Sequence, residues 1–179
     1  MKLGVPLVGP RVQVREHVAS DLDAYHAWRG DPESMRFLSW RSHSREESRA
    51  SLAEAIREQS NPARTKYFLA VEWSADGTIV GDVGLEVREP GEASLGWFLL
   101  PEFRGRGLAT EAAGLLIDFG SETLGLEKVL ASCDASHTAS ERVMQKCGMT
   151  LAVTTPRGSR PGTRLHYRLD FENRDRPCL

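Results

Sequence analysis

The sequence predicts an α+β (mixed α/β) protein with a mostly antiparallel central sheet of about seven strands flanked by helices. Three observations carry this prediction: two helical stretches follow an initial strand, three strands then follow one another with tight turns, and helices and strands alternate from there on. No repeat, low-complexity tract or linker divides the 179 residues. We therefore expect a single domain over 1–179, with a core over about 12–171 and short flexible termini.

The first part of the chain contains one strand and two helices. Val12 and Val14 alternate with polar residues, as in a short strand. Ser20 and Asp23 stand at N-cap spacing, which predicts a short helix over 22–28 that ends near Gly30, Asp31 and Pro32. Ser44 to Glu47 form a capping box, which predicts the start of the second helix.

The middle of the chain predicts three antiparallel strands and a helix. The strands cover 66–73, 79–87 and 93–100, and turn residues separate them at 76–77 and 89–91. Beyond them, apolar residues recur at helical spacing from Leu108 until Gly125.

The last part predicts a strand, a helix and a final pair of strands. Residues 129–133 form a short apolar run typical of a buried strand. Thr138 to Glu141 are interpreted as a second capping box, which starts a helix that Gly148 closes. The final strands are expected over 151–155 and 164–171.

Composition excludes several classes of function. Lys and Arg total 23 and Asp and Glu total 25, so a net charge of −2 offers no global attraction to nucleic acid or to an anionic membrane. Three cysteines without metal-ligand spacing predict reduced thiols and no metal site. Glycines and prolines interrupt the apolar residues near the N-terminus, and no apolar run approaches the roughly 18–20 residues of a membrane span. We expect a cytoplasmic protein, a monomer or a homodimer.

Gly105 and Gly107 stand between a predicted strand and a helix N-terminus, flanked by Arg104 and Arg106. Residues without side chains let several backbone N–H groups approach one anion, and the helix dipole adds positive potential. The P-loop pattern is absent, and Thr110 stands where a dinucleotide fingerprint needs Gly or Ala. The segment therefore predicts a phosphate or pyrophosphate site, with a plain surface turn as the alternative.

Several further segments, together with this loop, make the sequence resemble the GNAT acetyltransferases, and among them the RimJ/RimL branch of ribosomal-protein N-terminal acetyltransferases. The resemblance extends from about 12 to 171 and rests on these segments: Asp31 to Leu38 with Trp40, Val80 to Leu85, Leu95 to Leu99, Arg104 to Ala113, Ser140 to Val143 and Lys146 to Met149.

The resemblance implies an acetyl-CoA site. In the family, the strands that correspond to 93–100 and 129–133 (the fourth and fifth of the common fold) splay apart, and the pantetheine arm lies in the gap. It implies that the backbone near Trp97, Phe98 and Leu99 pairs with this arm and that one N–H there polarises the acetyl carbonyl. The pyrophosphate would be held by the amides of the loop: Arg104, Gly105, Arg106, Gly107, Leu108, Ala109 and Thr110.

The chain departs from the family at two positions near the expected thioester. Met144 stands where many members have a proton-donating tyrosine, so the resemblance to the RimL-like branch implies Ser140 as the general acid or the donor to the thiolate. His137 replaces an asparagine that contacts pantetheine. Its imidazole can keep that contact or shuttle a proton, or it can be only a polar helix cap.

The general base is less clearly marked. Ser94 stands where relatives often have a glutamate, and the nearby carboxylates are Asp82, Glu86 and Glu92. We interpret each of the three first as a solvated surface charge, and Glu86, in mid-strand, is our candidate base among them. With a pKa near ~7.8, roughly a quarter of an α-amine is neutral at pH ~7.4, against about 0.1% of a lysine amine. A site without a strong base therefore favours α-amines.

The acceptor side is expected to contain Trp28, Phe37, Trp40 and Tyr67, although core packing explains each of them equally well. The basic segment 157–164 is either a solvated loop or a rim of the acceptor site. Three functions stay open: acetyl transfer to a protein N-terminal α-amine, acetyl transfer to a small-molecule amine such as an antibiotic, a polyamine or an amino-acid derivative, and coenzyme A binding without catalysis.

Overall fold

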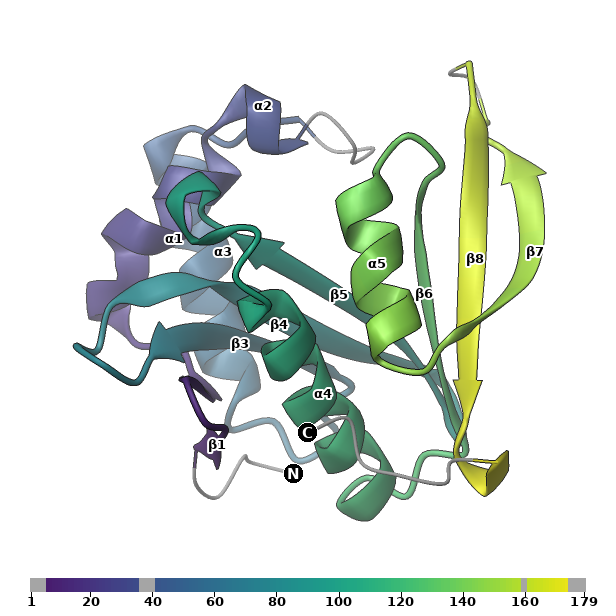
Figure 1. The fold of residues 1–179 in the computed structure, drawn as a ribbon. Helices are drawn as coiled ribbons and strands as arrows, with labels where there is room; N and C mark the ends of the chain where they lie inside the picture. The colour runs from purple at the N-terminus through teal and green to yellow at the C-terminus, as the bar shows by residue number, and fades with distance from the viewer. Residues whose placement is uncertain (1–5, 36–40, 159–160, 174–179) are drawn as a thin grey trace.

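A computed structural model describes residues 6–35, 41–158 and 161–173, and these residues form one eight-stranded sheet (Figure 1). Neighbouring strands are antiparallel except for β5 and β6, which run parallel. The expected mixed, mostly antiparallel fold is thereby confirmed. In spatial order the strands are β1 (Leu7–Val8), β2 (Val12–Glu16), β3 (Lys66–Trp73), β4 (Ile79–Glu89), β5 (Glu92–Leu99), β6 (Lys128–Asp134), β8 (Thr163–Asp170) and β7 (Thr150–Pro156).

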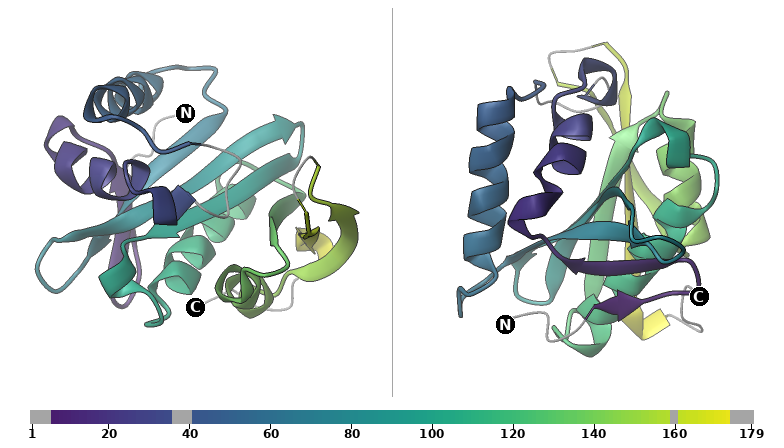
Figure 2. Two further views of the ribbon diagram at one scale, coloured as in Figure 1. Left: turned by 90° about the horizontal axis from the view of Figure 1, so that it is seen from above. Right: turned by 90° about the vertical axis from the view of Figure 1, so that its left-hand side faces the viewer.

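Helices cover both faces of the sheet (Figure 2). One face carries α1 (Leu22–Arg29), α2 (Pro32–Met35) and α3 (Arg45–Glu58), with α1 packed on β4 and α3 on α1. The other face carries α4 (Leu108–Glu122), which packs on β2, β4 and β5, and α5 (Thr138–Lys146), which packs on β6 and α4. No helix within the described ranges is long and apolar enough to cross a bilayer.

The main hydrophobic core lies between α4 and the sheet. Leu116 and Ile117 of α4 are fully buried, and Phe119 meets the ring of Tyr67 on β3 edge to face at 5.3 Å. A second, smaller cluster of Tyr25, Trp28, Met35 and Leu52 lies among the helices of the opposite face. The sheet therefore has one apolar layer on each side, and α4 is held rigidly enough to fix the position of its N-terminus.

The sheet opens between β5 and β6. These two strands pair only at Glu92–Lys128, Ala93–Val129 and Ser94–Leu130. Beyond Ser94, β5 continues to Leu99 paired with β4, whereas β6 continues to Asp134 paired with β8. The expected splay of these two strands is thus confirmed, and Figure 1 shows them diverging on either side of α5.

Local signals in the sequence were accurate at one capping box and wrong at the other. The Ser44 side chain accepts a hydrogen bond from the Glu47 N–H, and the Glu47 carboxylate accepts one from the Ser44 N–H, as predicted. Thr138 is instead the first residue of α5, and the cap position belongs to His137, whose side chain makes no capping bond. Glu141 accepts a hydrogen bond from the Tyr167 hydroxyl at 2.8 Å, and this tertiary contact prevails over the local box.

One short strand and one short α-helix were not predicted, and neither were three 3-10 helices at Ala19–Asp21, Pro101–Phe103 and Phe171–Asn173. Strand β1 has two residues between a proline and a glycine, and it forms because Leu7 and Val8 pair with Val14 and Gln13. Helix α2 begins at Pro32 directly after Asp31, whose carboxylate accepts hydrogen bonds from the N–H and the hydroxyl of Ser34. Neither element is long enough to show a periodic pattern in the sequence.

Candidate active site

A small pocket of about 110 Å³ lies where β5 and β6 diverge, next to the first turn of α5. Gly96 forms part of its wall, and an ideal Cβ built there would have no neighbour within 4 Å, so the β5 backbone is directly accessible. Four residues singled out in the sequence line this pocket together: Trp97, Phe98, His137 and Ser140. Other residues that line it were not predicted: Ser34, Ser132, Cys133, Asp134 and Arg164.

The hydroxyl of Ser140 lies in this pocket beside a sulfur atom, the thiol of Cys133 on β6. Burial raises the pKa of the Cys133 thiol to about 11, the charge of Glu141 adds to the effect, and the hydrogen bond with Ser140 acts against it. The thiol is therefore neutral near pH 7. Ser140, in the first turn of α5, and Cys133, on β6, therefore interact where both line the pocket.

The glycine loop precedes α4 and presents an open helix N-terminus. Gly105 and Gly107 have φ values of 76° and 81°, in the left-handed region that favours glycine, and Gly107 occupies the cap position of α4. An ideal Cβ at Gly105 would meet nothing within 4 Å, and one at Gly107 would meet only Arg11 Nη2 at 3.3 Å. The N–H groups of the first turn are thus open to an anion.

The arginines of the loop are held by protein groups. Arg104 Nε donates to the Leu99 carbonyl at 2.9 Å, and its guanidinium lies 5.6 Å from the Phe98 ring centroid. The Arg106 guanidinium lies 5.6 Å from the rings of both Trp73 and Phe103. These contacts hold both guanidinium groups close to the loop, where their charges add to the positive potential of the backbone N–H groups and the α4 dipole.

A large cleft of about 1110 Å³ lies on the opposite face, between the N-terminal helices and β7–β8. It shares residues 95–98 of β5 with the small pocket, so the same backbone segment is reached from both sides. Trp28, which we expected on the acceptor side, lines the cleft with its ring stacked 4.6 Å from that of Phe98. The arrangement suits two ligands that meet at β5.

The structure places the predicted base, Glu86, in the lining of the cleft and one predicted acceptor residue, Tyr67, in the core. Glu86 lines the cleft across from Ser94, 21% exposed, and forms ion pairs with Lys66 at 3.5 Å and Arg88 at 2.8 Å. The placement of Tyr67 on the acceptor side was wrong, since this ring is 2% exposed and packs against α4. Phe37 and Trp40 lie outside the described residues.

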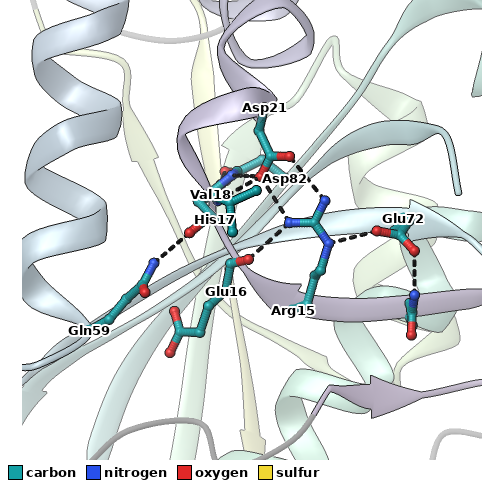
Figure 3. A network of polar contacts seen from close by, with 9 residues as sticks. Arg15, Glu16, His17, Val18, Asp21, Gln59, Glu72 and Asp82 are labelled. Atoms are coloured by element: carbon teal, nitrogen blue, oxygen red, sulfur yellow. Dashed lines mark hydrogen bonds and ion pairs between the residues drawn. The ribbon is translucent and has the colours of Figure 1, made fainter.

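A buried polar network adjoins the cleft and was missed in the sequence (Figure 3). The His17 imidazole contacts Asp21 Oδ2 at 3.3 Å and Asp82 Oδ2 at 2.8 Å, and Arg15 forms a two-bond ion pair with Asp21. Asp82 was interpreted as a solvated surface charge, yet it is 7% exposed and lines the cleft. His17 lies 65 residues away in the sequence, so no local pattern indicated the pair.

Comparison with known proteins identifies the class to which this fold and site belong. The profile of the family described as "Acetyltransferase (GNAT) domain" matches residues 11–150. The chain belongs to the GNAT acetyltransferase family and is an acyltransferase.

Individual relatives agree with this assignment. An uncharacterised N-acetyltransferase of Bacillus subtilis, YnaD, is 25% identical over 144 residues, which are 78% of this chain and 79% of the relative. Human alpha/beta-tubulin-N-acetyltransferase 9 is 29% identical over 150 residues, 78% of this chain and 70% of the relative.

Solved structures share the whole fold. A GNAT-family acetyltransferase from Bacillus anthracis superposes with a TM-score of 0.82 at 21% identity, covering 94% of this chain and 99% of that one. RimL, a ribosomal L7/L12 alpha-N-protein acetyltransferase solved with coenzyme A in disulfide linkage to a cysteine, gives a TM-score of 0.81 at 16% identity, with 93% and 98% coverage. The microcin C7 self-immunity acetyltransferase MccE, solved with acetyl-CoA and AMP, gives 0.78 at 14% identity, with 90% and 93% coverage.

Proposed function

We propose that the protein is an acetyl-CoA-dependent N-acetyltransferase that transfers the acetyl group directly to an amine, with a protein N-terminal α-amine as the preferred acceptor. The observation that carries the proposal is the opening between β5 and β6, which joins a backbone-lined pocket to the large cleft and lies beside the glycine loop. Similar structures solved with coenzyme A or acetyl-CoA support this choice of co-substrate.

The residues of the opening fit such a ligand. Past Ser94 the edge of β5 that faces β6 has no strand partner, so its N–H and C=O groups near Trp97, Phe98 and Leu99 can pair with an extended amide-bearing arm. The first-turn N–H groups of α4, with Gly105 and Gly107 bare of side chains, can hold a diphosphate. Acetyl-CoA supplies the activated acetyl group as a thioester.

Each step of the transfer has a candidate group. A backbone N–H near Trp97, Phe98 and Leu99 donates a hydrogen bond to the acetyl oxygen, where negative charge develops. Ser140 donates a hydrogen bond or a proton to the departing sulfur, a role supported by its position beside the Cys133 thiol. Glu86 accepts the proton of the attacking amine from the cleft side, and His137 contacts the arm or relays a proton.

The preference for an α-amine follows from how the candidate base is engaged. The Glu86 carboxylate forms ion pairs with both Lys66 and Arg88, so one of these contacts has to give way before Glu86 can accept a proton from a substrate. An α-amine with a pKa near ~7.8 already contains a useful neutral fraction, whereas a lysine near ~10.4 does not.

Release of free thiol from acetyl-CoA tests the proposal. The acceptor panel contains peptides with free N-termini, the same peptides N-formylated but with an internal lysine, spermidine and kanamycin. We expect turnover with the free N-termini and none with the formylated peptides. Preference for spermidine or kanamycin would support a small-molecule acceptor instead, and binding of acetyl-CoA without transfer to any amine would support a non-catalytic module.

A further inference from the structure

Arg11, at the turn between β1 and β2, reaches across to the start of α4. Its Nη1 donates to the carbonyl oxygen of Arg106 at 2.8 Å, and its Nε donates to Glu111 Oε2 at 2.9 Å. The other carboxylate oxygen of Glu111 accepts the backbone N–H groups of Arg11 at 2.6 Å and Val12 at 3.0 Å. The turn is thus joined to the glycine loop by one hydrogen bond and to the first turn of α4 by three, although 95 residues separate Arg11 from Arg106.

The bond to the Arg106 carbonyl fixes the orientation of one peptide group. In a trans peptide the C=O and the following N–H point in opposite directions. Because Arg11 holds the Arg106 oxygen on its own side, the Gly107 N–H points away from Arg11. Because residues 105 and 107 are glycines, few side chains restrain the orientation of this peptide group. The hydrogen bond from Arg11 to the Arg106 carbonyl supplies that restraint.

The ion pair with Glu111 removes an electrostatic obstacle. The Glu111 side chain is 5% exposed and lies in the first turn of α4, where its negative charge opposes the binding of an anion at the same helix end. The Arg11 guanidinium offsets this charge from a position that is 51% exposed and whose Nη2 lies 3.3 Å from the Cβ position of Gly107.

We propose that Arg11 is a positioning residue for the phosphate-binding loop: it orients the Arg106–Gly107 peptide and neutralises Glu111, so that the loop N–H groups are set for a diphosphate. The inference rests on the proposed function, since the diphosphate is that of coenzyme A. It predicts that Arg11 contributes to the affinity for ligands that carry the diphosphate and not to the affinity for the pantetheine arm alone.

The test compares three ligands on wild type and Arg11→Ala. Coenzyme A and 3′-dephospho-coenzyme A are titrated by calorimetry, and S-acetylpantetheine, which lacks the diphosphate, by NMR. We expect Arg11→Ala to weaken the first two by about tenfold, the value of one hydrogen bond to a charged group, and to leave the third unchanged. A variant that only loosened the fold would weaken all three ligands alike.

Arg41→Ala is the matched control, because Arg41 also joins a carboxylate, that of Glu47, to a backbone carbonyl, that of Ser42, but at the start of α3. If Arg11→Ala does not fold, Arg11→Lys takes its place, since a lysine keeps the charge but cannot hold Glu111 and the Arg106 carbonyl together as a guanidinium does.

Three results would overturn the inference. Equal coenzyme A affinity in Arg11→Ala and Arg41→Ala would remove the role of Arg11 while leaving the proposed function intact. A loss confined to coenzyme A, absent with the 3′-dephospho form, would mean direct contact with the 3′-phosphate in place of positioning. Failure of the wild type to bind coenzyme A would overturn the proposed function and this inference with it.

Discussion

His17 Nε2 lies 2.8 Å from Asp82 Oδ2, and this contact ties the segment after β2 to the floor of the large cleft on β4 (Figure 3). The other ring nitrogen faces Asp21 at 3.3 Å, so the imidazole bridges two carboxylates while almost fully buried. Both ring nitrogens can donate only when the imidazole is protonated. The two carboxylates therefore favour the protonated form of the buried imidazole.

The protonation of His17 predicts a pH-dependent stability. Burial lowers the pKa of His17, but the hydrogen bonds and charges of Asp21 and Asp82 outweigh burial and raise it from 6.5 to about 9. Because the folded pKa is higher than the unfolded one, this contribution of up to about 3 kcal/mol is complete below pH ~6.5 and is lost as the pH rises through ~9.

Urea unfolding of wild type and His17→Gln at pH 6 and pH 10 measures this effect. The difference between their free energies of unfolding should be larger at pH 6 than at pH 10. A difference that stays constant, or grows toward pH 10, would show that the imidazole is neutral in the folded protein.

Ser140→Ala should lower kcat on the order of 10²-fold, the usual effect of losing a general acid, with little change in the KM for acetyl-CoA. The matched control is Ser121→Ala, since Ser121 is also a half-buried helical serine but lies in the last turn of α4. Steady-state thiol release with a free N-terminal peptide gives both constants. An unchanged kcat would remove Ser140 from the proposed chemistry.

Glu86→Gln should reduce kcat across the pH range, because the amide cannot accept a proton from the amine. Glu92→Gln is the control: Glu92 is also half-buried and bound to a lysine, Lys128, at 2.8 Å, but it does not line the cleft. Rate profiles from pH 6 to 9 compare the two. Equal profiles for both variants would leave Glu86 as a structural ion-pair partner.

Gly107→Glu should abolish acetyl-CoA binding, since its carboxylate would stand where the loop is proposed to hold phosphate. Gly125→Glu is the matched control. It adds the same charge at another glycine with a left-handed backbone, φ 64°, which lies beyond the other end of α4 with open space around it. Each variant should lose on the order of 1–2 kcal/mol of stability. If calorimetry found normal binding in Gly107→Glu, the loop would not be the phosphate site.

Much of the fold was predictable because its elements carry their own patterns. The alternation over 66–73 and the apolar spacing after Leu108 gave a strand and a helix at nearly their observed bounds. The family resemblance named four residues that the small pocket brings together: Trp97 and Phe98 on β5, Ser140 on α5 and His137 at the cap position before α5.

What the sequence missed depends on long-range contacts. Asp82 is buried with His17 packed beside it. Arg11 donates a hydrogen bond to the Arg106 carbonyl in the glycine loop because the turn between β1 and β2 lies next to α4. Neither contact leaves a local pattern in the sequence. The prediction for Tyr67 was wrong for a similar reason. An aromatic residue on a strand with alternating side chains can face either side of the sheet, and the position of α4 decides which side is the core.

A crystal structure with acetyl-CoA tests the central claim most directly. The account predicts the diphosphate at the N–H groups of residues 107–110, the pantetheine arm between β5 and β6, and the thioester sulfur within hydrogen-bond distance of Ser140 Oγ. An acetyl-CoA molecule bound elsewhere, or with its sulfur out of reach of Ser140 and its diphosphate away from the glycine loop, would contradict it.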